Sequence, residues 1–274
     1  MNSNNANFPQ QRDEAGVKSK LEWHRFSVII LLLAALTASC NRDGFTISGT
    51  IDGGAGHTLW LEEIAPEGPI FIDSIPVDSR GRFNYSYTPP YRSLYNLHTS
   101  ENNYIVTLPD RGEHLEVTGR WDNLSLTYKV TGSPESQLLW QLQQYTNDGS
   151  TLLRGLVDTL GRYEAMLLAD QIDEAVLDSV KTVTDSLYHV AFLEQQEYID
   201  RFIDENRGSL ATLIALYKPF NNRLIIDTRS PMSIDYYDMV LEGLQERLPD
   251  NPHTLRFKNT TEHLRSALAR QAEQ

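Results

Sequence analysis

The chain has 274 residues, of which 37 are acidic, 24 are basic and 40% are hydrophobic. This composition is typical of a folded protein with one or two domains rather than of a disordered chain. A net charge of −13 disfavours direct binding of nucleic acid, and a single cysteine, Cys40, excludes an intramolecular disulfide, a Cys-x-x-Cys redox pair and a thiolate zinc cluster.

The first feature along the chain is the core of a signal peptide. Residues 26–38 form an apolar run of thirteen residues behind a basic segment, which is too short to cross a membrane as a helix of about 20 residues. The stretch Leu36–Cys40 resembles a bacterial lipobox, which implies cleavage after residue 39 and attachment of diacylglycerol to the sulfur of Cys40. A secretion signal without lipid and a short signal-anchor are the alternatives.

This lipid anchor decides where we expect the protein to be. Residues 1–39 would be the signal peptide and residues 40–44 a short lipidated leader, and the remaining chain would carry a net charge of −14. Two or three acyl chains anchor a protein stably, while an acidic domain is repelled by anionic headgroups. We therefore expect a lipid-anchored protein of the cell envelope, on the outer membrane and facing the periplasm or the cell surface, with membrane lipid as its partner through Cys40.

Residues 45–132 carry the signature of short β-strands. Apolar and β-branched residues alternate with polar ones, and turn residues interrupt them every eight to twelve positions. The predicted strand segments are 45–48, 58–61, 70–72, 82–85, 93–97, 104–108, 114–117 and 124–128. Seven or eight antiparallel strands in so short a stretch indicate a small β-sandwich or open barrel.

Residues 133–274 change to helical periodicity. Ser133 is a suitable N-cap with Pro134 at the first helical position, and a long helical stretch follows that could bend into a hairpin near Ala169 and Asp170. Further helices are predicted for 210–216, 233–248 and 254–269. The fold class is therefore segregated α+β, with an all-helical domain packed on or beside the strand domain.

Several fragments of the strand half, in this order, carry a family resemblance: 45–51, 59–61, 73–78 running into 81–83, 95–97 and 130–133. Together they resemble the N-terminal domain of Bacteroidota envelope lipoproteins related to thiol:disulfide interchange proteins, known as domain of unknown function 4369. In that family a thioredoxin-like domain with a Trp-Cys-x-x-Cys site often follows. No cysteine follows Cys40 here, so the resemblance implies the architecture and the envelope location but not the redox activity.

Aromatic side chains of the strand half are the candidate contact residues. Trp60, Tyr85, Tyr87 and Trp121 could stack on sugar rings or anchor a partner protein if they are exposed, and Tyr85 and Tyr87 should share a face of one strand. If they are buried, the same residues are sandwich core.

Four hydroxyl residues lie in the pattern Asp-Ser/Thr-aliphatic, which resembles the acceptor of the O-glycosylation system of these envelope proteins. They are Ser74, Thr159, Ser179 and Ser186. The aliphatic residue at most of these sites is also needed for the core.

The remaining motifs give no catalytic residue, no metal site and no cofactor. The histidines are scattered without metal-ligand spacing, and Glu62 and Glu63 point to opposite faces of a strand, which argues against a glycosidase pair. We expect a non-enzymatic binding or scaffold module with an envelope protein or glycan as its partner. The alternatives are an envelope glycan or peptide hydrolase with carboxylates assembled in the fold, and an accessory subunit of a separate thioredoxin-like protein.

Overall fold

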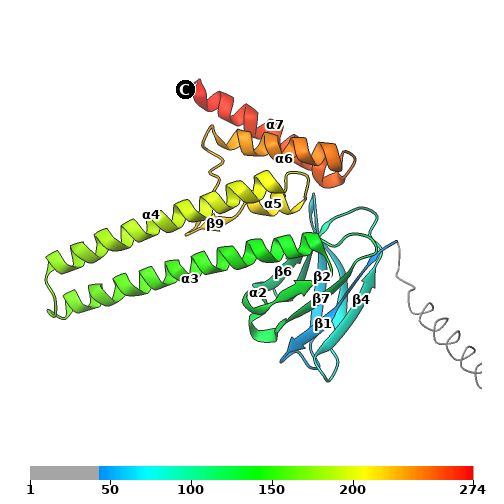
Figure 1. Cartoon of the computed structure of the whole chain (residues 1–274), viewed down its shortest axis with the longest axis horizontal. Helices are drawn as coiled ribbons and strands as arrows, with labels where there is room; N and C mark the ends of the chain where they lie inside the picture. Colours follow the sequence, from blue (N-terminus) through cyan, green and yellow to red (C-terminus); the bar gives the residue numbers. More distant parts are fainter. Residues whose placement is uncertain (1–42, 274) are drawn as a thin grey trace, which may run out of the picture. The chain divides into compact units, whose positions relative to one another are not determined.

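Two four-stranded sheets pack face to face in the first half of the structure, a computed structural model that describes residues 43–273 (Figure 1). The strand order is β4-β1-β7-β8 in one sheet and β3-β2-β5-β6 in the other. The strands are β1 (Phe45–Asp52), β2 (Thr58–Ala65), β3 (Gly68–Pro76), β4 (Arg82–Tyr87), β5 (Leu94–Ser100), β6 (Asn103–Thr107), β7 (His114–Arg120) and β8 (Lys129–Thr131). The alternating apolar residues meet between the two sheets, so the predicted sandwich is confirmed.

One strand pair departs from the antiparallel prediction. β1 and β7 are parallel, with Gly49 opposite Val117. A Cβ atom on Gly49 would lie 1.7 Å from the carbonyl oxygen of Val117, so the absent side chain allows this close approach. The alternation of apolar and polar residues along a strand shows which side chains face the core, but not which strand lies beside it. The sequence therefore does not distinguish parallel from antiparallel pairing.

The prediction of a last strand at residues 124–128 is wrong. Leu124–Thr127 form a short helix, α2, after a 3-10 turn at Trp121–Asn123, and β8 begins only at Lys129. Leu124 and Tyr128 are both buried, and their spacing of four residues fits one face of a helix as well as one face of a strand. The Thr127 hydroxyl donates to the carbonyl of Asn123 and accepts from the amide of Arg120, which stabilises the turn.

Helices make up most of the second half, so the segregated α+β class is confirmed. The helices are α3 (Pro134–Leu168), α4 (Glu174–Glu205), α5 (Ala211–Leu216), α6 (Ser233–Arg247) and α7 (Pro252–Ala272), with a small hairpin of β9 (Pro219–Phe220) and β10 (Arg223–Leu224). The Ser133 side chain caps α3 by accepting from the amide of Ser136, as predicted. The predicted bend lies between α3 and α4, where Asp170 adopts a positive φ of 55°.

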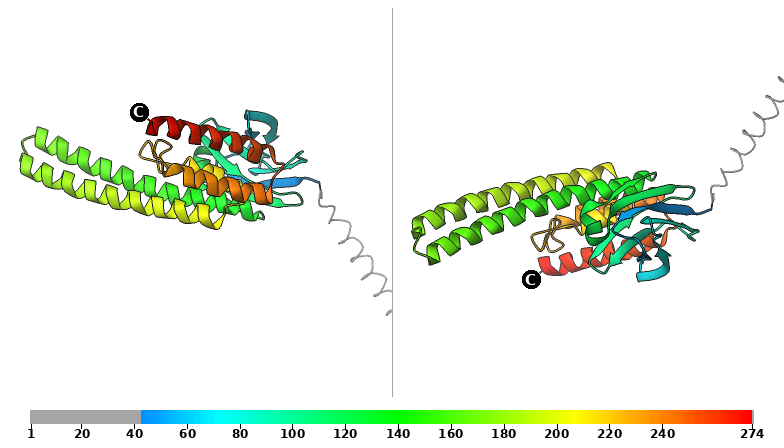
Figure 2. Two further views of the ribbon diagram at one scale, coloured as in Figure 1. Left: turned by 90° about the horizontal axis from the view of Figure 1, so that it is seen from above. Right: turned by 90° about the horizontal axis from the view of Figure 1, so that it is seen from below.

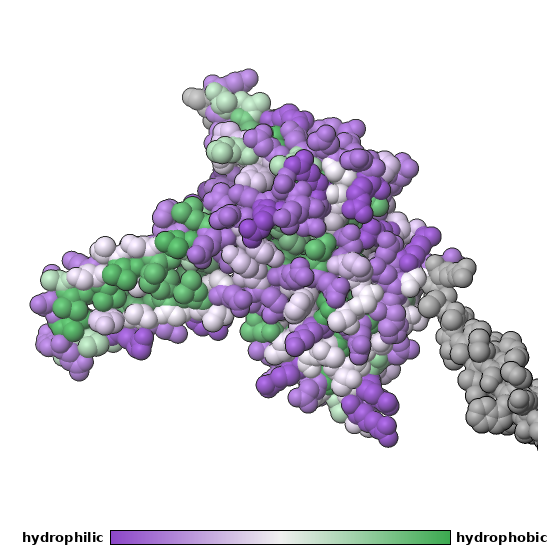
Figure 3. Space-filling model, in the orientation of Figure 1, coloured by the Kyte–Doolittle hydropathy of each residue, from purple (hydrophilic) through white to green (hydrophobic). Residues whose placement is uncertain are grey.

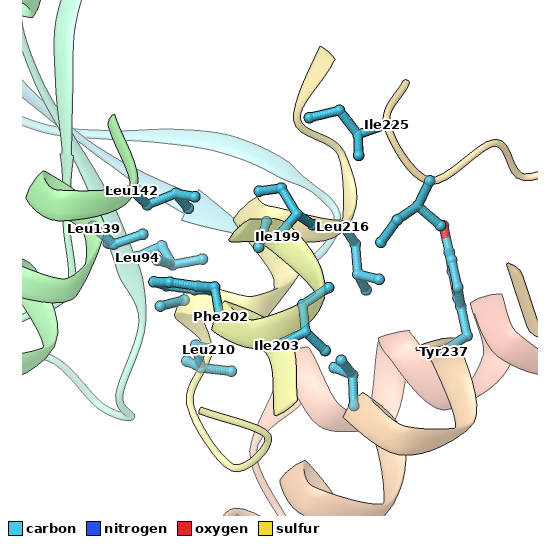
Figure 4. Close-up of a cluster of buried hydrophobic side chains, with 14 of the residues drawn as sticks. Leu94, Leu139, Leu142, Ile199, Phe202, Ile203, Leu210, Leu216, Ile225 and Tyr237 are labelled. Carbon is cyan, nitrogen blue, oxygen red and sulfur yellow. The ribbon is translucent and has the colours of Figure 1, made fainter. Parts of the chain in front are cut away.

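The helices share a core with the sandwich. Leu94 and Leu108, from the strand half, join Leu142 of α3 and Ile199 and Phe202 of α4 in one buried cluster (Figure 4). Residues 43–273 therefore belong to one compact unit, although β8 ends and α3 begins at the predicted boundary. The signal segment, Cys40 and the leader up to residue 42 lie outside the described residues.

Candidate functional site

The hairpin of α3 and α4 extends beyond the rest of the compact unit (Figure 2). We call residues 150–190 of this hairpin the arm, and the rest of the described chain the body. Only Leu177 and Thr184 are buried within the arm, where α3 and α4 pack against each other. Two helices side by side cannot enclose a core, so many apolar side chains of the arm remain in contact with solvent.

A second apolar seam runs along each arm helix. In α4 it consists of Val176, Val180, Val183, Leu187 and Val190, spaced by four, three, four and three residues. In α3 the spacing of Leu152, Leu156, Thr159 and Tyr163 is four, three and four. Such spacing is typical of a helix that packs against a neighbour along a heptad seam. Each helix therefore has one seam for the other helix of the hairpin and one seam without a neighbour.

The two free seams form the walls of one apolar groove, which we call the arm groove. Its volume is about 670 Å³. Figure 3 shows it as a hydrophobic stripe along the hairpin. The lining residues are Leu156, Thr159, Tyr163, Asp173, Ala175, Val176, Ser179, Val180, Val183, Thr184 and Leu187. The Val183 side chain is 57% exposed and Leu152, at the body end of the seam, is 46% exposed.

Each end of the arm groove has a defined boundary. At the tip the Asp173 carboxylate accepts from the amide of Val176 and so caps α4. Asp173 is the one acidic or basic residue among those that line the groove. At the body end the rings of Tyr145 and Tyr198 stack with centroids 3.7 Å apart, and the Tyr145 hydroxyl donates to the carbonyl of Glu194.

The opposite side of the arm is different in chemistry. Helical spacing places six exposed charged side chains there: Arg154, Glu164, Glu174, Asp178, Lys181 and Asp185. None of these residues lines the arm groove. The arm is therefore amphipathic as a unit, with a solvated back and an apolar groove face.

A buried polar cluster joins the strand half to α7. Ser93 Oγ and His253 Nε2 lie 2.8 Å apart, and the Tyr91 hydroxyl donates to the carboxylate of buried Glu63. Burial lowers the pKa of His253, which the nearby Glu63 carboxylate partly offsets, and burial with that hydrogen bond raises the pKa of Tyr91 to about 12.

Sequence reasoning missed this cluster because 160 positions separate Ser93 from His253. The residue types are those of a nucleophile, a base and an orienting carboxylate. However, Ser93, His253 and Glu63 are all buried, so no substrate reaches the Ser93 hydroxyl in this conformation. The cluster is a polar joint between the strand half and α7.

A second polar joint lies beside the first. The Arg92 guanidinium is 3.5 Å from the carboxylate of Asp110 and 3.4 Å from that of Glu135, at the start of α3. The Ser209 hydroxyl, before α5, donates to Glu135, and the Asn251 side chain, before α7, donates to the carbonyl of Arg92 at 2.8 Å. One arginine thus connects the loop before β5 with three helices.

The four aromatic candidates do not converge on one surface. Trp60 is 36% exposed on the outer face of β2, next to His98, with ring centroids 5.7 Å apart. Tyr85 and Tyr87 share β4 and are half-buried beside the sandwich core. Trp121 stacks on the ring of His57 at 4.6 Å.

The predicted acceptor hydroxyls lie in two settings. Ser74 is exposed on β3, at an edge of its sheet. Thr159 and Ser179 line the arm groove and Ser186 lies on α4. In these three helical residues the hydroxyl donates to the carbonyl four positions earlier, at 2.8 Å. A glycan on Thr159 or Ser179 would occupy the groove.

Within residues 43–273, no group of three or more His, Cys, Asp or Glu side chains is arranged to hold a metal ion. Nor does any helix in that range have the length and apolar character needed to cross a membrane.

Comparison with known proteins identifies one domain. Residues 45–139 match the family described as Domain of unknown function (DUF4369). No curated protein and no solved structure matches the chain. The matched region covers the sandwich and the first residues of α3, so the whole arm lies outside it.

Proposed function

We propose, for a chain whose residues 45–139 form a DUF4369 domain, a non-enzymatic role as a lipid-anchored binding module of the cell envelope. The body supports the arm, and the arm groove receives a helical segment of a protein partner. The observation that carries this proposal is that the arm is amphipathic. One face carries an apolar seam from each of its two helices, and the opposite face carries charged residues.

The physical argument is the cost of leaving this face in water. Half-exposed Leu and Val side chains gain about 25 cal/mol for each Å² of apolar surface that a partner removes from solvent. A contiguous apolar patch with a polar surround is typical of an interaction surface. Heptad spacing on both walls favours a helical partner, because a helix can insert its own side chains between those of the two seams.

The anchor is the second part of the proposal. The lipobox-like stretch Leu36–Cys40 supports acylation of Cys40 and a location at the outer membrane. Metabolic labelling with an alkyne fatty acid tests it: the native chain should carry the label and Cys40→Ala should lose it. A native chain without label would contradict the anchor.

The hydrolase alternative has less support. The arrangement closest to a catalytic constellation in residues 43–273 is the buried Ser93, His253 and Glu63 cluster, whose hydroxyl does not meet solvent. The alternative of an accessory subunit for a thioredoxin-like protein is compatible with the DUF4369 domain and would make that protein the occupant of the groove.

Two matched valine variants test the docking role. Val183 lines the groove and Val157 lies outside it, and their exposures are 57% and 59%. In crosslinked envelopes, the full chain and Val157→Asp should capture the same protein contact, and Val183→Asp should lose it. A contact that is equal in both variants, or absent from the native chain, would refute the role of the groove.

A further inference from the structure

Building on the proposed docking role, we infer that the occupant of the arm groove is the arm groove of a second copy of this chain. The two hairpins pack face to face around a two-fold axis and form a four-helix bundle. The same surface then serves both copies, as an isologous interface requires.

The seam pattern favours a partner with two helices. Each helix of a four-helix bundle has two close neighbours and carries apolar positions toward both of them. In α4, Leu177 and Thr184 are buried in the single hairpin, whereas Val176, Val183 and Leu187 of the groove are 40 to 57% exposed. In α3, Leu152, Leu156 and Tyr163 form the corresponding seam, and Leu152 is 46% exposed. A second hairpin supplies one new neighbour to each helix.

The distribution of charge also favours a copy of the same chain. A net charge of −13 opposes self-association unless the contact surface itself is uncharged. Asp173 is the one acidic or basic residue that lines the groove, and it caps α4 at the tip. The rim between these ends carries hydroxyl groups, among them those of Thr159 and Ser179. A strongly basic partner helix would find no matching row of carboxylates along the groove.

The size of the face is sufficient for a reversible dimer. The seams run over residues 152–163 of α3 and 176–190 of α4, which span about 20 Å, and two helices side by side are about 20 Å wide. The contact would therefore cover about 400 Å² on each copy, or about 800 Å² in total, which is the size of a weak and transient association. Anchoring both copies in one membrane would raise their local concentration.

The approach of a second hairpin meets little steric obstruction. Gly155 is one turn from Leu152 and Thr159 along α3, and a Cβ atom added there would meet nothing within 4 Å. The absence of a side chain at Gly155 and the small side chain of Ser179 leave room for the Leu and Tyr side chains of the other copy.

Sedimentation of the full chain in detergent, with micelles in large excess over protein, tests the dimer. The native chain and Val157→Asp should pass from monomer to dimer as the concentration rises. For Val183→Asp the dissociation constant should rise at least tenfold. Circular dichroism should be equal for all three, because both valines are largely exposed in the monomer.

The outcomes separate this inference from the docking role. A native chain that stays monomeric at every concentration, or a Val183→Asp variant that dimerises like the native chain, overturns the inference. If the native chain is monomeric but Val183→Asp still loses a contact with another protein in crosslinked envelopes, the docking role stands and the second copy is refuted. If that contact is also absent, both are refuted.

Discussion

The body and the arm share the helices α3 and α4, but the apolar side chains of these helices are buried in the body and largely exposed in the arm. In α4, Ala191, Ile199, Phe202 and Ile203 are buried against the strands and the other helices, whereas Val183 and Leu187 of the same helix are about half exposed. The body therefore completes its own core, and the arm does not. The DUF4369 match covers part of the body and stops before the arm, so the feature that we connect with binding is not part of the family domain.

The largest expected effect contrasts two leucines of α3. Leu142 is fully buried in the shared core, so Leu142→Ala should lower the free energy of unfolding by about 2 to 5 kcal/mol. Leu152, at the body end of the α3 seam, is 46% exposed, so Leu152→Ala should change it by less than about 0.5 kcal/mol at a concentration where the chain is monomeric. Urea denaturation measures both. Equal losses would mean that the arm is as tightly packed as the body.

The next largest expected effect is on the stability of the body and comes from Lys218. Its ammonium donates to Gln143 of α3 at 2.7 Å, and burial lowers its pKa to about 8. Because the folded state then binds this proton less tightly than the unfolded state, stability should rise between about pH 8 and pH 10. Lys218→Met should remove that rise and increase stability at pH 7 by about 1 to 3 kcal/mol.

Lys181→Met on the exposed back of the arm is the control for Lys218→Met. It should alter neither the stability at pH 7 nor its pH dependence by more than about 0.5 kcal/mol. A Lys218→Met protein less stable than the native chain would show that the hydrogen bond to Gln143 outweighs the desolvation of the charge.

His253 should make the body sensitive to acid. Its pKa is lowered by burial, so the folded state takes up a proton less readily than the unfolded state. Stability is therefore complete above the unfolded pKa of about 6.5 and falls as the pH decreases below it, by at most about 1.4 kcal/mol per pH unit. His253→Gln should flatten the stability profile between pH 7 and pH 5, while His189→Gln, exposed on the arm, should leave it unchanged. A profile of unaltered slope in His253→Gln would rule out this residue as the source.

The smallest expected effect is on the arm itself. Val183→Asp and Val157→Asp should each change the stability of the monomer by less than about 0.5 kcal/mol, because neither side chain is part of a core. Thermal unfolding of dilute protein checks this. A large loss in Val183→Asp alone would indicate that the groove is closed in solution by the chain's own residues.

Local signals predicted much of the fold. Ser133 and Pro134 mark the start of α3, and the turn chemistry separates the strands, because caps and turns depend on adjacent residues. The parallel pairing of β1 with β7 depends on distant residues and was not foreseen. The segment 124–128 was misassigned because one spacing of apolar residues fits two structures.

The candidate site was less accessible to sequence reasoning. Val176, Val180, Val183 and Leu187 fit the helical periodicity predicted for this stretch, but periodicity alone does not say whether a neighbour covers that face. In the structure Val176, Val183 and Leu187 are 40 to 57% exposed. The Ser93 and His253 pair had no signal in the sequence, since the fold alone brings these residues together.

Hydroxyl-radical footprinting of the full chain in intact envelopes tests the central claim, that the groove face of the arm is covered in place while its back is not. Leu152, Val183 and Leu187 are to be compared with Val157 in the same experiment, and with the same residues in dilute purified protein. The account predicts strong protection of these three residues of the apolar seams in envelopes and none of Val157. Equal labelling of all four in envelopes and in dilute protein would contradict it.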